Sequence, residues 1–180
     1  AIFPSSKGGQ PFAGNGRGTL AVCTGNVTTW KRIRDMPCCD VGLVQELKEA
    51  DLGKIAKELR LGSNLSFHGN PSVGTVANGL SAGVGIYTRI ERQSAPIPDI
   101  CPFLLPLDES RVTLRIIEGI FPHGVLVISV YLHTGEGLSG RNWAILSAIG
   151  ERVRALGIPF ILGGDFQNHP DILRSTGWPE

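Results

Sequence analysis

The chain has 180 residues, of which 42% are hydrophobic, and a formal net charge of +1. This length and apolar content are enough for one domain with a buried core. A charge so close to zero gives no broad positive field that would indicate a nucleic-acid partner, although a local basic surface would not show in the total. Because no segment reaches the roughly 18 apolar residues of a membrane helix, we expect no membrane span.

The four cysteines, Cys23, Cys38, Cys39 and Cys101, form no C-x-x-C pair and no regular disulfide framework. Such spacing indicates reduced thiols and therefore an intracellular protein, in a compartment that the sequence does not specify. The sequence begins without methionine and stops soon after a predicted strand. We therefore expect it to be a fragment of a longer protein.

Residues 1–18 are rich in glycine, proline and serine, which predicts a flexible lead-in before a domain over residues 19–180. Strands and helices alternate in the first part of this domain. Apolar residues recur at helical spacing from Leu52 to Leu59 and indicate an amphipathic helix. The elements expected here are a strand over 20–27, a short helix over 28–36, a strand over 40–46 and a helix over 52–62.

The middle of the domain is predicted to contain consecutive strands without helices between them. Residues 125–132 (VLVISVYL) are almost wholly apolar, which is typical of a central strand covered on both faces. The elements expected from here to the end are strands over 82–89, 112–121, 125–132 and 158–162, and a helix over 143–156. This order indicates a layered α/β sandwich, with Trp30 and Trp143 in its core.

A glycine-rich segment offers one interpretation of function. Gly135 to Gly140 (GEGLSG) satisfy the pattern G-x-G-x-x-G, follow a predicted strand and open a predicted helix. In a dinucleotide-binding module the glycines would let a pyrophosphate approach the backbone, and Asp165 would accept a hydrogen bond from a ribose hydroxyl. Against this interpretation, His133 and Thr134 separate the strand from the first glycine, where the motif usually turns at once.

A second interpretation begins at residues 161–167 (ILGGDFQ), where an apolar strand ends in two glycines followed by Asp165. Asn26 and Glu46 also stand at the ends of predicted strands. Mg²⁺ prefers hard oxygen ligands and is commonly held by one or two carboxylates together with substrate phosphate. These side chains therefore indicate a metal-assisted phosphate site. Each also has a structural alternative, because Asn26 and Asp165 suit turns and Glu46 suits a helix start.

Four short motifs follow one another along the chain. They are residues 24–27 (TGNV), 44–46 (VQE), 129–131 (SVY) and 164–167 (GDFQ). In this order they resemble the motifs of the endonuclease/exonuclease/phosphatase superfamily, which includes abasic-site endonucleases, deoxyribonuclease-like enzymes, inositol polyphosphate phosphatases and retroelement endonucleases. The resemblance implies an α/β fold, a four-layer sandwich of two sheets flanked by helices, truncated at its C-terminus so that the final strands are missing.

The resemblance also implies a role for each site residue. Glu46 would hold Mg²⁺, for which Mn²⁺ can substitute, and Asn26 would assist the metal or its water. Tyr131 would donate a hydrogen bond to the phosphate, unless it is an ordinary core aromatic residue. Asp165 would orient or activate the attacking water, next to Gln167, which stands where the family usually has asparagine. The expected function is therefore Mg²⁺-dependent phosphodiester hydrolysis.

The family resemblance favours nucleic acid as the substrate, with a phosphorylated small molecule or lipid as the alternative. Two departures from the family pattern bear on activity. The family often follows its tyrosine with a proline and a nearby asparagine, whereas this chain has Leu132, His133 and Thr134. The family also ends in a Ser-Asp-His motif that has no counterpart here, so a weak or inactive fragment is one expectation. A non-catalytic interaction domain on the same fold is the third hypothesis, beside the hydrolase and the dinucleotide-binding module.

Overall fold

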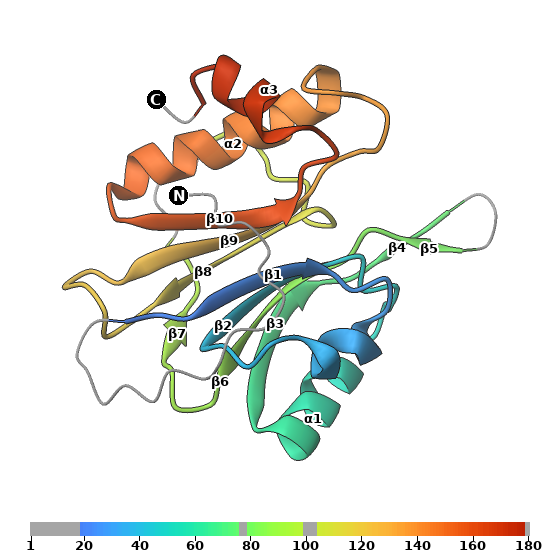
Figure 1. Cartoon of the computed structure of the whole chain (residues 1–180), viewed down its shortest axis with the longest axis vertical. Helices are drawn as coiled ribbons and strands as arrows, with labels where there is room; N and C mark the ends of the chain where they lie inside the picture. Colours follow the sequence, from blue (N-terminus) through green and yellow to red (C-terminus); the bar gives the residue numbers. More distant parts are fainter. Residues whose placement is uncertain (1–18, 76–78, 99–103, 179–180) are drawn as a thin grey trace.

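The computed structural model describes residues 19–75, 79–98 and 104–178, so the predicted lead-in over residues 1–18 lies outside the described part. Two four-stranded sheets face each other, and helices cover their outer faces (Figure 1). None of the described helices is long and apolar enough to cross a membrane. The predicted layered α/β sandwich is confirmed.

The first sheet combines parallel and antiparallel pairs. Its strands, in spatial order, are β1 (Val22–Asn26), β2 (Val41–Gln45), β6 (Val84–Arg89) and β3 (Leu65–Asn70). β1 and β2 run parallel, whereas β6 is antiparallel to both of its neighbours. A two-stranded ribbon of β4 (Val73–Gly74) and β5 (Leu80–Ser81) extends away from this sheet (Figure 1).

The second sheet is also mixed. Its strands, in spatial order, are β10 (Phe160–Asp165), β9 (Val125–Tyr131), β8 (Val112–Ile117) and β7 (Ser94–Ala95). β9 and β10 run parallel and are joined by a crossover helix, while β8 is antiparallel to both of its neighbours. Each sheet thus contains one parallel pair, and both pairs end at the edge that carries the polar residues described below.

The helices close the outer layers. They are η1 (Trp30–Asp35), a 3₁₀ helix, α1 (Leu52–Ser63), α2 (Gly140–Leu156) and α3 (Pro170–Ser175). The Asp51 side chain begins α1 by accepting a hydrogen bond from the Lys54 amide at 3.0 Å, and Asn64 ends it in the left-handed conformation. Glu46 therefore does not cap this helix.

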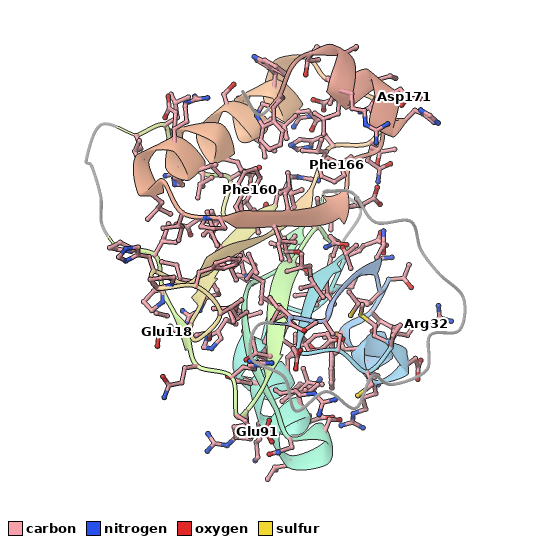
Figure 2. All side chains as sticks on the ribbon, turned by 60° about the vertical axis from the view of Figure 1, so that its left-hand side comes forward. Arg32, Glu91, Glu118, Phe160, Phe166 and Asp171 are labelled. Atoms are coloured by element: carbon pink, nitrogen blue, oxygen red, sulfur yellow. The ribbon has the colours of Figure 1, made fainter. Side chains whose placement is uncertain are left out.

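Three apolar layers hold the four structural layers together. One lies between α1, η1 and the first sheet and includes Trp30, as predicted; another lies between the two sheets. The third lies between the second sheet and helices α2 and α3, where Phe160 and Phe166 pack (Figure 2). β9 is buried along its whole length because layers cover both of its faces, as the apolar run predicted.

The core position predicted for Trp143 was wrong, and the sequence analysis did not predict β3, β4, β5, β7 or α3. Trp143 is 39% exposed, because α2 turns Asn142, Ile145 and Ile149 toward the sheet instead. β3 was not predicted, since it is an edge strand in which Phe67 is the only buried residue and no apolar alternation shows.

The boundaries of two strands also differ from the predicted ones. β10 continues through both glycines to Asp165 instead of stopping at residue 162. The strand predicted over 112–121 ends at Ile117, shortly before Gly119 takes a positive φ of 83°.

Candidate active site at the sheet edge

The predicted site residues meet where the two parallel strand pairs end. Asn26, the last residue of β1, stands next to Gln45 of β2, and Tyr131, the last residue of β9, stands next to Asp165 of β10. Glu46 follows β2 directly. Strand ends of both sheets thus place side chains from distant parts of the chain at one edge of the sandwich.

Asn26 joins the two sheets through its side chain. Its Nδ2 donates to Asp165 Oδ2 at 3.1 Å, across 139 residues of sequence. Its Oδ1 accepts a hydrogen bond from the Thr28 amide at 3.0 Å, which makes a local turn in which Thr28 has a φ of 52°. Asn26 is therefore a turn residue and a cross-sheet donor at once, so the two interpretations of this residue are compatible.

The two glycines before Asp165 allow this contact. A Cβ at Gly163 would lie 2.7 Å from Leu43 Cδ1 and 3.1 Å from the Thr24 side chain, on the opposite sheet. A Cβ at Gly164 would collide with the Val130 carbonyl group of β9. Only a strand without side chains at these positions can approach both neighbours so closely, and this approach brings Asp165 within reach of Asn26.

Two donors orient the Asp165 carboxylate. Oδ2 accepts from Asn26, and Oδ1 accepts from the Gln167 amide at 3.2 Å. Gln167 has a φ of 54°, in the left-handed region that costs a residue with a side chain free energy. The surrounding structure therefore holds a strained turn that fixes the direction of the carboxylate.

Glu46 lies at the second strained strand end of the edge. Its φ is 62°, and its Oε1 lies 3.7 Å from Lys48 Nζ, whose own φ is 50°. The Glu46 side chain is 19% exposed, so its carboxylate is accessible yet partly enclosed. Left-handed residues of this kind cluster at functional sites more than elsewhere.

Tyr131 is close enough to Glu46 and Asp165 for both carboxylates to affect the pKa of its phenol. It is 8% exposed and packs against Ala82 and Val84. Burial raises the pKa of the phenol, and the negative charges of Glu46 and Asp165 raise it further. The hydroxyl therefore keeps its proton at neutral pH and remains a hydrogen-bond donor.

Arg111 is a residue that the sequence analysis missed. Its guanidinium group lies 5.1 Å from the centre of the Tyr131 ring and donates to the Tyr131 carbonyl oxygen at 3.2 Å. Burial lowers the pKa of Arg111, although the nearby Asp108 opposes this effect. Arg111 supplies a positive charge beside the phenol, but no motif or spacing distinguishes it in the sequence.

Asn142 was also missed, and it shapes the loop that follows Tyr131. Its fully buried side chain accepts from the His133 amide at 2.7 Å and donates to the carbonyl oxygens of His133 and Gly137 at 2.9 and 2.8 Å. These hydrogen bonds hold the two ends of the loop together.

The second sheet, whose strand β9 precedes this loop, is mixed rather than mostly parallel. The fold therefore does not support the dinucleotide-binding interpretation of Gly135 to Gly140.

The donor set was compared with the needs of a divalent cation. In the described part of the chain, no three His, Cys, Asp or Glu side chains lie close enough together to hold a metal ion. Mg²⁺ does not require such a group, because one or two carboxylates with water and phosphate oxygens suffice. Glu46 and Asp165, whose negative charges both raise the pKa of the Tyr131 phenol, offer two such carboxylates.

The chain was then compared with known proteins. No curated protein sequence matches it. Among solved structures, it is similar to ANGEL2, described as a 2′,3′-cyclic phosphatase in complex with adenosine-2′,3′-vanadate, with 13% sequence identity and a TM-score of 0.58. The match covers 84% of this chain and 54% of that one, so the chain spans about half the length of its structural neighbour.

The sequence also matches a family model, and this match covers most of the described domain. The model is that of the Endonuclease/Exonuclease/phosphatase family, and it matches residues 20–171. This range contains both sheets and every residue of the strand-end site. The four ordered motifs, the sandwich of two mixed sheets and the family model agree, and the chain belongs to the endonuclease/exonuclease/phosphatase family.

Proposed function

We propose that this chain carries the phosphate-binding part of a Mg²⁺-dependent phosphodiester hydrolase that acts on nucleic acid. The observation that carries the proposal is the hydrogen bond from Asn26 to Asp165 beside Tyr131. It brings one carboxylate, one amide and one phenol from three strands to a single accessible edge. Family membership supports the reaction class.

In this proposal, Glu46 and the oxygen atoms near it hold the metal ion, with Mn²⁺ able to replace Mg²⁺. A bound divalent cation would neutralise charge on the phosphate and lower the pKa of water. Its natural ligands here are the Glu46 carboxylate and, through water, Asn26. Glu46 takes the left-handed conformation directly after β2, and strain of this kind is often found at functional sites.

The remaining side chains act on the water and the phosphate. Asp165 accepts a proton from the attacking water, and the hydrogen bonds from Asn26 and the Gln167 amide keep its carboxylate aimed. Tyr131 donates to a phosphate oxygen, which the raised pKa of its phenol permits across the neutral range. Asp165 would thus act on the attacking water, and Tyr131 would bind the phosphate.

Metal binding can be tested without relying on turnover. We expect Mg²⁺ or Mn²⁺ to raise the Tm of the parent chain, because an ion that binds only the folded state stabilises it. Glu46→Gln should abolish the rise. Glu118→Gln is the matched control, since Glu118 is exposed and lies at the end of its sheet away from the tip of β10 (Figure 2). An equal rise in all three proteins, or none in the parent, would contradict the metal assignment.

The substrate is tested separately with the same proteins. Supercoiled plasmid and single-stranded RNA in Mg²⁺ are expected to be cleaved by the parent and by Glu118→Gln, and not by Glu46→Gln. A 2′,3′-cyclic nucleotide forms a third arm, because the structural neighbour is described as a 2′,3′-cyclic phosphatase. Hydrolysis of that compound alone would replace the proposed substrate with a terminal cyclic phosphate, whereas a folded chain that binds metal and cleaves none would favour the interaction domain.

A further inference from the structure

A pair of thiols lies in the first sheet, apart from the residues assigned to hydrolysis. Cys23 is in β1, and Cys39 precedes β2, its parallel neighbour. Their Sγ atoms are 2.7 Å apart, and both residues are free cysteines. The Tyr87 hydroxyl lies 3.2 Å from Cys23 Sγ and 3.4 Å from Cys39 Sγ, so the three polar groups form one cluster in which Cys39 and Tyr87 are buried and Cys23 is partly exposed.

The cluster is not sealed from solvent, because Cys23 is partly exposed and a pocket adjoins Cys39. A pocket of about 280 Å³ opens beside η1 and is lined by Cys39 and Tyr87, together with the basic residues Arg34 and Arg89. Cys23 does not line it. A small neutral molecule in the pocket would therefore lie next to Cys39, although Cys23 is the more exposed residue of the pair.

The two sulfur atoms also differ chemically. The hydrogen bond that Cys39 accepts from Cys23 lowers the pKa of Cys39 to about 7, with a further contribution from Tyr87. The same hydrogen bond, together with burial, raises the pKa of Cys23. Near neutral pH Cys39, which is buried but lines the pocket, is therefore partly thiolate, the nucleophilic form, whereas Cys23 remains a thiol.

We propose that Cys39 and Cys23 form a dithiol that a hydroperoxide oxidises to a disulfide. Cys39 thiolate attacks one peroxide oxygen, the O–O bond breaks, and Cys39 becomes a sulfenic acid while hydroxide, or an alkoxide, leaves and takes a proton. The Cys23 sulfur then attacks the Cys39 sulfur, the S–O bond breaks, and the oxygen leaves as water with the Cys23 proton. Two thiols and one hydrogen peroxide thus give one disulfide and two water molecules. With an organic hydroperoxide, the products are one disulfide, one water molecule and one alcohol.

The folded structure needs little adjustment for this reaction. A disulfide bond is about 2.05 Å long, so the sulfur atoms have to approach by only about 0.7 Å. Cys23 lies in β1, and Cys39 lies two residues before β2, the strand that pairs with β1. The oxidised protein should therefore keep its fold, and the new bond should raise its Tm because it joins residues 16 positions apart.

Cys38 provides the internal comparison. It is adjacent to Cys39 in the sequence, it is exposed, and it accepts a hydrogen bond from Arg89 at 2.6 Å. Exposure alone would make Cys38 the residue that is oxidised first. The reaction is instead assigned to Cys39, because Cys39 has a second thiol, Cys23, within reach, whereas the sulfur atom of Cys38 contacts Arg89.

The experiment uses the chain with Cys38→Ser and Cys101→Ser, so that only the proposed pair remains. Hydrogen peroxide is added at neutral pH, free thiols are counted, and peptides are identified by mass spectrometry before and after reduction. We expect both thiols to be lost together, a Cys23–Cys39 cross-linked peptide that dithiothreitol releases, and a reversible rise in Tm. Two thiols that stay free, or that are oxidised singly without a cross-link, would overturn the proposal.

Single variants test the order of attack. In Cys23→Ser, dimedone should trap a sulfenic acid on Cys39, because no resolving thiol remains. In Cys39→Ser, Cys23 should stay unlabelled during the same exposure. Dimedone on Cys23 but not on Cys39 would contradict the assigned order, and circular dichroism of each variant shows whether it has folded. This outcome does not depend on hydrolytic activity, so it is separable from the function proposed above.

Discussion

Two side-chain pairs that join the sheets of this protein differ mainly in burial. Asn26 donates to Asp165 at the exposed edge, while Gln45, the neighbour of Asn26 on β2, donates to Ser129 Oγ at 2.9 Å inside the sandwich. Gln45 and Ser129 are 1% and 0% exposed. The same type of contact between the same two sheets therefore occurs once in an exposed environment and once in a buried one.

The difference shows what burial decides. Ser129 Oγ accepts from Gln45 and donates to the Val44 carbonyl oxygen at 3.0 Å, so the inner contact is enclosed by protein partners. It has no access to a ligand, and its loss would leave a buried donor unpaired. The outer contact has solvent on one side. We therefore expect the outer pair to control activity and the inner pair to control stability.

The largest expected effect is on activity, at the outer contact. Asp165→Asn should lower kcat for phosphodiester hydrolysis by about 10²–10⁴-fold, because an amide cannot accept the proton of the attacking water. The Tm should change little, since an exposed hydrogen bond contributes little to folding and asparagine still has one acceptor oxygen. Rate measurements in Mg²⁺ and calorimetry check both parts. A large fall in Tm would show that Asp165 is structural.

The inner contact should respond in the opposite way. Ser129→Ala should reduce the free energy of unfolding by about 1–3 kcal/mol, because it leaves the Gln45 amide with only a 3.5 Å contact to Thr24. Urea unfolding measures this loss. Replacing both partners, as Gln45→Leu with Ser129→Ala, should cost less than the sum of the single changes. Normal stability with lost hydrolysis in Ser129→Ala would refute the division.

We expect a moderate effect of pH on folding stability, through His133 in the loop after Tyr131. Burial lowers the pKa of His133, with contributions from the positive charges of Arg111 and Arg141. The unfolded chain therefore takes up this proton first as the pH falls below 6.5, so the stability that neutral His133 provides is lost as the pH falls from 6.5 through the folded pKa. His133→Asn should flatten this part of the stability profile. An NMR titration in which His133 titrates at or above 6.5 would contradict the assignment.

The smallest effect concerns Gln167, which stands where the family usually has asparagine. Asparagine adopts the left-handed conformation more readily than glutamine, so Gln167→Asn should stabilise the fold by a few tenths of a kcal/mol. Hydrolysis should persist, because the backbone amide that orients Asp165 is retained. Unfolding and rate measurements on this variant and on Gln167→Ala test the idea. An equal loss of activity in both would assign the function to the glutamine side chain instead.

Short sequence features predicted local packing well, because that packing depends on the chemistry of a single segment. Two glycines before Asp165 indicated a close approach of backbones, and the structure shows that approach against Leu43 and Val130. The apolar run of β9 indicated a strand covered on both faces, and both faces are covered. Such features depend on one segment and its immediate surroundings, so a single sequence carries them.

The positions of the buried polar residues could not be predicted, because they depend on partners far away in the sequence. Asn142 occupies the buried face of α2, where its amide closes the loop after Tyr131. Trp143, the next residue, lies on the exposed side instead of in the predicted core. No spacing rule pairs Gln45 with Ser129, which are 84 residues apart. A polar residue in a core is explained only when its partner is known.

The sequence by itself determined the family, the order of the main strands and helices, and the residues of the strand-end motifs, because these follow from apolar periodicity and from short motifs. Only the tertiary structure decided which polar residues meet. It placed Asn26 on Asp165 at an open edge, Gln45 on Ser129 inside, and Cys23 beside Cys39. The physical reason is that burial and pairing are properties of contacts between segments, and these contacts arise when two sheets pack face to face.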